Sequence, residues 1–504
     1  MGEFLKNYEP VNPTTWVYLA SLLLIALYFK FSRLWSVRNL DLIGLMAFSP
    51  GLLMVNFGSQ EANVTKELAG YIWLFAVGGL FMVRLLLDSV MVRRPLLEPN
   101  LSAGGLTFLG VTLFIFLMTN VLVINRNLLD RPPAEKTNGG DVAGPVVADN
   151  GEIGPAEFAN YGPGNPLFFH YCAGFWTHPP VKTTVLKTVV EPSSTNGPTT
   201  NGPTKNGNET ENGGANKDIA KVEPLPADVH PPAEIAAKEP TLLPYDAQNR
   251  AIAVASHILI VLGLVIIGQW HFDNLRTGIA AAGLYLLLPY TAQWTGQVTH
   301  VLPGALLLWA IVTYRRPFLA GLFLGLAIAT VYYPIFLLPL WISFYFQRGW
   351  RRLMLGVLSG AGILVASMWC QAASSEQFLG WVKQTFGLRL PASKNLEGFW
   401  GLQYIDPVYR IPVLAAFLVV AFSFVLWPSR KNLGTLLSCS AVVMLATQFW
   451  HAHRGGVHMA WYLPLMLLTI FRPNLEDRVA TTVLGEGWFS RRKPLQPAPT
   501  TPQT

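Results

Sequence analysis

Residues 251–269, AIAVASHILIVLGLVIIGQ, form an apolar stretch without a single Asp, Glu, Lys or Arg. A helix needs about 20 apolar residues to cross the hydrocarbon core of a bilayer, so this stretch predicts a transmembrane helix. Irregular backbone cannot face lipid, because its polar groups would lack partners there. The stretch therefore indicates an integral membrane protein.

The same apolar pattern recurs along the chain. Of its 504 residues, 51% are hydrophobic and 13% are charged, whereas a soluble protein would carry about a quarter charged residues. We predict an all-α fold, a polytopic bundle of about 12 to 13 transmembrane helices with a long, partly disordered extracytoplasmic loop. The expected spans cover residues 15–31, 41–57, 69–87, 104–124, 251–269, 276–291, 298–314, 317–331, 333–346, 352–371, 409–427, 434–449 and 458–471.

Basic residues decide the orientation of these spans, because Lys and Arg are retained on the cytoplasmic side. Pro334 interrupts residues 317–346, which form either one kinked helix or a tight hairpin. Only the hairpin puts all basic clusters on one side, so we favour it, with the N-terminus outside and the C-terminus in the cytoplasm. The clusters are Lys30/Arg33/Arg38, Arg93/Arg94, Arg315/Arg316, Arg348/Arg351/Arg352, Arg430/Lys431 and the tail from Arg472 to Lys493.

The expected spans divide the chain, a multi-pass protein of the cell membrane, into four parts. Residues 1–126 form an N-terminal membrane module of four spans, and residues 251–472 form a C-terminal membrane module. Residues 127–250 form the extracytoplasmic loop, which we expect to be disordered at about 190–240, where Asn, Gly, Thr and Pro prevail. Residues 473–504 form a cytoplasmic tail.

Ionisable residues inside spans are the usual indication of ion transport or proton relay, and this chain has few. Arg84 lies near the cytoplasmic end of its span, and we interpret it as a snorkelling side chain. His257 lies about two turns into its span, and we interpret it as structural, since a single His near an interface is common. This pattern disfavours a coupled ion transporter.

Composition disfavours other classes of function. The net charge is +7, but no basic run with interleaved aromatic residues occurs, so no nucleic-acid partner is expected. Cys172, Cys370 and Cys439 are too few and too scattered for a disulfide framework or a zinc site. Membrane lipids are the expected partners, and no cofactor is predicted.

Most histidines fall on the extracytoplasmic side of the predicted topology. The densest group, His451, His453, Arg454 and His458, lies in a short loop between two spans. Imidazoles together with a guanidinium suit an anionic group such as phosphate, through charge-assisted hydrogen bonds. A divalent metal is an alternative that neither the spacing nor a neighbouring carboxylate supports. The remaining interpretation is a polar loop between helices.

A second polar group, residues 293–300 with the sequence QWTGQVTH, interrupts an otherwise apolar region at the same side. Polar side chains at membrane depth have to face protein or a water-filled cavity. Gln297 and His300 are therefore candidates for substrate binding at the mouth of a cavity. Hydrogen bonding between helices is the alternative interpretation.

An extracytoplasmic transferase would need a carboxylate as general base, and six are expected on that side of the membrane: Glu61, Glu67, Asp130, Glu376, Glu397 and Asp406. Two of them border an expected span. Asp130 directly follows an expected span, and Asp406 directly precedes one. Either is a candidate catalytic residue at a cavity mouth. Each could equally be a helix cap or an interfacial charge.

The order of motifs between Leu284 and Arg352 resembles the polytopic GT-C glycosyltransferases, especially those that use polyprenyl-phosphate mannose. The outer His458, followed by Tyr462, is similar to a His-Tyr step before the late spans of that family. Val331 stands where the family has a lysine three residues before its proline. The motifs are Leu284–Pro289, Gly296-Gln297, Tyr314–Pro317, Leu319–Gly325, Pro334 and Arg348–Arg352.

The resemblance implies a GT-C-like fold and a hexosyltransferase that moves a sugar from a lipid-phosphate donor at the extracytoplasmic face, with a polyprenyl-phosphate sugar as its donor. In that role His451, His453 and Arg454 would hold the phosphate, and Asp130 or Asp406 would accept a proton from the attacking hydroxyl. A transporter of lipid or polysaccharide without covalent chemistry, or a membrane assembly protein with the same fold, is the alternative.

Overall fold

The computed structural model describes residues 12–88, 97–129, 244–371, 374–376, 378–379, 396–402, 404–428, 431–452 and 454–473. They belong to one compact unit, Met1–His178 with Leu242–Thr504. A second unit, Pro179–Thr241, lies outside the described residues, as do the predicted disordered segment and the tail from residue 474.

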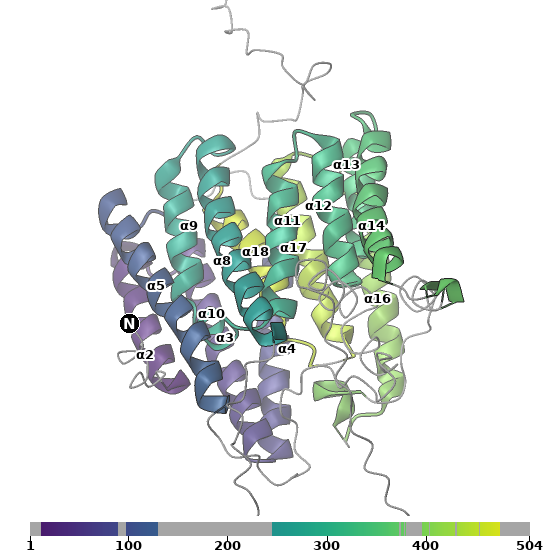
Figure 1. Cartoon of the computed structure of the whole chain (residues 1–504). Helices are drawn as coiled ribbons and strands as arrows, with labels where there is room; N and C mark the ends of the chain where they lie inside the picture. The colour runs from purple at the N-terminus through teal and green to yellow at the C-terminus, as the bar shows by residue number, and fades with distance from the viewer. Residues whose placement is uncertain are drawn as a thin grey trace, which may run out of the picture. The chain divides into compact units, whose positions relative to one another are not determined.

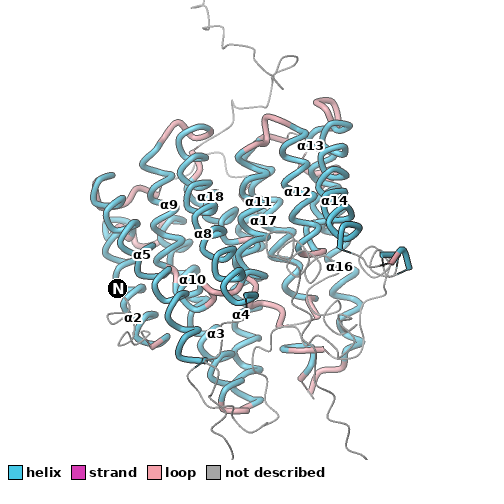
Figure 2. The backbone as a smooth tube through the Cα atoms, viewed as in Figure 1, coloured by secondary structure: helices cyan, strands magenta, loops and turns pink. Residues whose placement is uncertain are grey.

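The described part of the chain is helical and contains no strand, so the predicted all-α fold is confirmed (Figures 1 and 2). A helical segment occurs at the position of every expected span. These segments are α2 (Pro13–Tyr28), α3 (Val37–Gln60), α4 (Val64–Leu87), α5 (Ala103–Leu129), α8 (Pro244–Trp270), α9 (Leu275–Leu287), α10 (Pro289–Gln293), α11 (Val298–Val312), α12 (Pro317–Thr330), η2 (Tyr333–Leu337), α13 (Leu338–Tyr345), α14 (Trp350–Gln371), α16 (Arg410–Ser423), α17 (Leu433–Trp450), η5 (Met459–Trp461) and α18 (Leu463–Phe471).

Helix length and composition support a multi-pass membrane protein. Five helices among the described residues, α3, α4, α5, α8 and α17, are long and apolar enough to cross a membrane. Six further apolar helices among the described residues are shorter, with 10 to 17 residues. How many of the helical segments cross completely, and in which direction, stays a prediction.

Short polar side chains start several helices in the expected way. Asn12, Ser36, Asn63, Asn274 and Asn432 each stand at an N-cap and accept a hydrogen bond from a backbone N–H of the first turn. Such caps satisfy donors that have no partner within the helix. The polar residues between the apolar stretches therefore fix where these helices begin.

The hairpin predicted at Pro334 is present. After α12, Val331 is extended (φ −144°, ψ 124°), and the chain turns through η2 into α13. A Cβ added to Gly321 would collide with the carbonyl group of Leu353, and one added to Gly325 with that of Val357. Four residues further along α12, the contact has moved four residues further along α14. The two helices are therefore parallel and in close contact. The intervening α13 therefore runs in the opposite direction.

Two ends of the helix bundle can be distinguished. We call one of them the basic end, because it carries Lys30 and Arg276. Lys30 binds Asn100, and Arg276 donates to the Leu101 carbonyl oxygen at 2.9 Å. The Tyr345 hydroxyl donates to the Tyr314 carbonyl oxygen at the same end. The turns α8–α9, α11–α12 and α13–α14 lie at this end, at the top of Figure 1. The opposite "histidine end" carries His300, His451 and His458.

Candidate functional site

Three histidines from distant segments meet at the histidine end. His300 lies in the first turn of α11, His451 caps the C-terminus of α17, and His458 precedes η5. The ring centroids of His300 and His458 are 4.3 Å apart and nearly parallel (22°), and those of His451 and His458 are 4.7 Å apart. All three side chains are buried. We call these residues the histidine cluster.

Aromatic side chains surround the histidine cluster. Trp294 stacks on His300 at 4.9 Å with an interplanar angle of 4°, and Tyr333 contacts His451 at 4.7 Å. The Tyr290 hydroxyl pairs with Nδ1 of His300 at 2.9 Å. This hydrogen bond fixes the orientation of the imidazole.

The loop between α17 and η5 is held by a buried amide. The Gln448 Oε1 atom accepts hydrogen bonds from the backbone N–H groups of Gly456 and His458, both at 3.2 Å. Gly456 (φ 95°) and Arg454 (φ 48°) adopt left-handed conformations within this loop. Below it, Trp461 Nε1 donates to the Thr299 carbonyl oxygen at 3.0 Å and so ties the loop to α11.

His257 on α8 is hydrogen-bonded to two segments next to the histidine cluster. Its Nε2 donates to the Thr295 carbonyl oxygen at 3.0 Å, and its Nδ1 accepts from the Tyr285 hydroxyl at 3.1 Å. Both ring nitrogens are thus occupied, and the side chain is buried. His257 therefore holds the turn that follows α10, in agreement with its structural interpretation.

Arg454 lies beside a segment that the sequence did not connect with it. The Glu397 N–H donates to the Ala452 carbonyl oxygen at 3.0 Å, and the Arg454 N–H donates to the Glu397 carbonyl oxygen at 3.1 Å. At the next residue, Gly398 (φ 67°), an added Cβ would lie 2.6 Å from the Tyr71 hydroxyl and 2.7 Å from Arg454 Cα. Only glycine fits this close approach without strain. The 396–401 segment thereby joins α4 to the loop between α17 and η5, residues 451–458, which we call the histidine loop.

Charges of both signs meet around Arg454. Glu67 lies in the first turn of α4, one turn before Tyr71, and is partly buried. The Arg454 guanidinium is within electrostatic range of Glu67 and of Tyr71. It forms no ion pair with any carboxylate in the part of the chain that the structure describes. Arg454 and Glu67 are thus two charged side chains at the histidine end that are not paired with each other.

Residues 230–448 match the family model of glycosyltransferase family 87. This is a GT-C-type membrane family, so the resemblance predicted from the sequence is confirmed for this part of the chain. The match supports a membrane glycosyltransferase in general. Searches against curated proteins and against solved structures gave no match.

The matched residues include His300 and end just before the other two members of the histidine cluster. His451 and His458 lie three and ten residues after the end of the match, and α2, α3, α4 and α5 precede its start. The part of the molecule similar to family 87 therefore supplies most of the frame of the site. Arg454, Glu67 and Tyr71 come from outside it.

The structure brings together some of the predicted site residues. His300, His451 and His458 are in contact, and Arg454 lies in the same loop. Gln297 stands at the N-cap position of α11, three residues before His300, without a capping hydrogen bond from its side chain. The two polar groups predicted from the sequence thus meet at the histidine end, and the roles of their residues stay predictions.

The other predicted site residues are not placed in it. Asp406 is exposed, and its side chain accepts a hydrogen bond from the Val408 N–H at 2.9 Å as the N-cap of η4 (Pro407–Tyr409). This contact matches the alternative interpretation of Asp406 as a cap. Asp130 and His453 lie outside the described residues. Their proposed roles stay predictions.

Arg410 was not predicted to take part. It is buried, its Nε donates to the Trp450 carbonyl oxygen at 2.7 Å, and its guanidinium lies 5.8 Å from the centre of the Trp450 ring. It is thus a second guanidinium next to the start of the histidine loop.

Within the described residues, no group of three or more His, Cys, Asp or Glu side chains is arranged to hold a metal ion.

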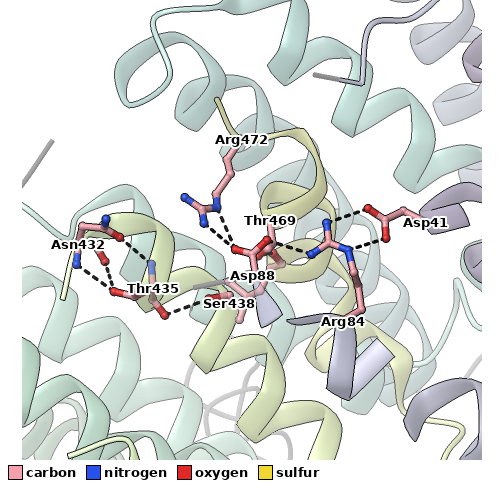
Figure 3. A network of polar contacts seen from close by, with 9 residues as sticks. Asp41, Arg84, Asp88, Asn432, Thr435, Ser438, Thr469 and Arg472 are labelled. Atoms are coloured by element: carbon pink, nitrogen blue, oxygen red, sulfur yellow. Dashed lines mark hydrogen bonds and ion pairs between the residues drawn. The ribbon is translucent and has the colours of Figure 1, made fainter. Parts of the chain in front are cut away.

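A separate polar network lies at the basic end (Figure 3). Arg84 binds Asp41 through Nε (2.9 Å) and Nη2 (3.0 Å), and Asp88 through Nη1 (3.1 Å). Asp88 in turn accepts from Arg472 at 2.6 Å. The interpretation of Arg84 as a snorkelling side chain is therefore wrong, because two carboxylates satisfy it inside the protein. This network joins α3, α4 and the residue that follows α18.

Proposed function

We propose that the protein transfers a sugar from a lipid-phosphate donor to a hydroxyl acceptor at the histidine end. The observation that carries this proposal is the convergence of His300, His451 and His458 beside Arg454. Imidazole N–H groups and a guanidinium are suitable donors for a phosphate, and buried donors bind a developing charge more strongly than exposed ones. The family match supports sugar transfer as the reaction.

The chemistry requires one bond to break and one to form. The acceptor oxygen attacks the anomeric carbon of the sugar, and the bond from that carbon to the phosphate oxygen breaks. The leaving phosphate keeps the electron pair and gains negative charge. Donors from His300 Nε2, His458 and Arg454 would stabilise that charge where it develops. The sugar remains on the acceptor, and the lipid phosphate leaves.

A carboxylate has to accept the proton of the attacking hydroxyl. Asp130 and Asp406 are the two candidates singled out from the sequence, and we add Glu67, another of the carboxylates expected on the extracytoplasmic side. The position of Glu67 supports this role, because it lies one turn before Tyr71, whose hydroxyl approaches Gly398 beside Arg454. Asp406 is engaged as a helix cap instead. We therefore rank Glu67 first.

Purified protein in lipid nanodiscs, supplied with polyprenyl-phosphate hexoses carrying a radiolabelled sugar, tests the proposal. We expect release or transfer of the label. The variants Glu67→Gln, Asp406→Asn and Asp130→Asn identify the base, since only one of them should abolish turnover while the protein stays folded. Absence of turnover with every polyprenyl-phosphate hexose, together with absence of binding to those donors, would refute the proposed function.

The orientation in the membrane belongs to the same proposal. The basic residues at one end favour a cytoplasmic location for that end. The histidine cluster would then lie at the extracytoplasmic face, where polyprenyl-phosphate sugars would be bound.

A further inference from the structure

Five arginines lie together on two turns at the basic end. Arg315 and Arg316 belong to the α11–α12 turn, Arg348 belongs to the α13–α14 turn, and Arg351 and Arg352 lie directly after it in the first turn of α14. All of them are exposed except Arg348, which is partly exposed. We call these five residues the arginine patch.

The fold holds the two turns side by side. The Tyr345 hydroxyl donates to the Tyr314 carbonyl oxygen. Tyr314 directly precedes Arg315, and Tyr345 lies three residues before Arg348. Gly349, with φ of 108°, packs against Pro317, so that a Cβ there would lie 3.4 Å from the proline ring. The parallel contact between α12 and α14 continues from this point. The arginine patch is thus a consequence of the hairpin at Pro334 and is built from residues more than thirty positions apart.

Among the described residues, no carboxylate neutralises the patch. None of its five arginines forms an ion pair with the described residues. The sequence itself contains no Asp or Glu between Asp273 and Glu376. Two of the guanidinium groups lie over aromatic rings instead, Arg315 over Tyr314 and Arg351 over Trp350, each at 5.8 Å. Five positive charges are thereby left available to an anion.

The residue type points to phosphate rather than to charge alone. Retention on the cytoplasmic side needs only positive charge and accepts Lys as readily as Arg. Yet the chain contains no Lys between Asp273 and Glu376. The planar guanidinium binds phosphate oxygens through two parallel hydrogen bonds, which an ammonium cannot do. In addition, α12 and α14 both begin here, and the positive ends of their dipoles favour an anion.

Exposed aromatic side chains border the patch. Phe346 is 66% exposed, Trp350 39% and Phe318 38%. Aromatic residues of this kind are enriched where a protein meets the boundary between head groups and acyl chains. They place the arginines at the depth of lipid phosphates rather than out in solution.

We propose that the arginine patch binds the phosphate of an anionic phospholipid. This site is independent of the proposed sugar transfer, because it lies at the end of the bundle opposite the histidine cluster. Its ligand is recognised by a phosphate group between guanidinium forks and by acyl chains beside the aromatic residues. A bound lipid would bridge the α11–α12 and α13–α14 turns.

The test compares phosphate recognition with charge. Full-length protein is purified in neutral detergent, and binding of phosphatidic acid, phosphatidylcholine and inorganic phosphate is followed by native mass spectrometry and thermal stability. The main variant replaces all five arginines with lysine, which keeps the charge and therefore the topology. The control is Arg33→Lys, which changes an exposed arginine of another turn at the same end.

We expect phosphatidic acid to bind and to raise the unfolding temperature, and phosphatidylcholine to do neither. In the variant with all five arginines replaced by lysine, the affinity for phosphatidic acid should fall by about fivefold or more, because the bidentate contacts are lost. Arg33→Lys should bind phosphatidic acid as the unchanged protein does. Equal binding by the Lys variant would overturn the proposal and leave the patch a topological signal. Inorganic phosphate that binds as tightly as phosphatidic acid would also overturn it, in favour of a soluble anion.

Discussion

Asp88 and Arg472 form a buried ion pair at 2.6 Å across 384 positions of the chain (Figure 3). Asp88 follows α4, and Arg472 follows α18, so the pair joins the N-terminal helices to the C-terminal end of the membrane region. Arg84 extends it to Asp41 on α3. Asp41, Asp88 and Arg472 are at most 7% exposed. Removing one member of such a network leaves a buried charge uncompensated, which is far more costly than losing a surface pair.

The first prediction follows from this network. Asp88→Asn should lower the free energy of unfolding by about 3 to 5 kcal/mol, because Arg84 and Arg472 both lose a charged partner in a buried position. The measurement is denaturant unfolding in a mild detergent. The matched control is Glu61→Gln, which breaks the exposed pair between Glu61 and Lys66 and should change stability by less than about 1 kcal/mol. Equal effects of the two variants would contradict the prediction.

Close packing of α12 against α14 gives the second prediction. Gly321→Ala introduces a Cβ that collides with the backbone carbonyl of Leu353, where no flexible side chain can move aside. We expect a loss of about 1 to 3 kcal/mol in unfolding free energy, as for other overpacked sites. Gly362→Ala on α14 is the control, because a Cβ there meets nothing within 4 Å. A variant at Gly321 as stable as the one at Gly362 would argue against the parallel contact.

The third prediction concerns orientation. A phosphatase reporter fused after Arg348 should be inactive, since the α13–α14 turn belongs to the basic end and basic turns are retained in the cytoplasm. The same reporter fused after Glu61, between α3 and α4 at the histidine end, should be active. Activity of the first fusion would reverse the proposed topology and move the histidine cluster to the cytoplasmic face.

The fourth prediction separates the histidine cluster from other buried histidines. His458→Ala should reduce sugar transfer by about a hundredfold, if its N–H stabilises the leaving phosphate. His271→Ala is the control, because His271 is also buried but lies at the basic end, where its Nε2 donates to the Val312 carbonyl oxygen at 2.9 Å. Similar losses of transfer in both variants, at matched stability, would indicate a general structural effect.

The sequence predicts the helices well, because apolar length and polar caps are local properties. The hairpin at Pro334 was also predicted, since the charges of Arg315 and Arg348 have to lie on the same side. The contact of their turns through Tyr314 and Tyr345 could not be predicted, because a hydroxyl–carbonyl hydrogen bond leaves no mark on hydropathy or charge.

The candidate site was predicted only in part, for a physical reason. His451 and His458 stand out because polar residues interrupt apolar sequence. Glu67, by contrast, lies in a helical first turn, where an acidic residue is favourable by itself. Nothing in its neighbourhood indicates that Arg454 comes close in space. Asp406 shows the opposite case, because a carboxylate before a span also satisfies free backbone donors.

Tyr28 on α2 buries its hydroxyl against α9, donating to the Ala280 carbonyl oxygen at 2.9 Å, and its ring contacts Phe471 edge to face. With the Asp88–Arg472 pair, this contact joins the chain before residue 130 to the chain after residue 243 without any help from the peptide that connects them. A protease cut in that connection would therefore leave two fragments that purify together. The cleaved protein would remain folded in the membrane as a complex of two chains. The region similar to family 87 on its own, without α2, α3 and α4, would lose helices that pack against its core.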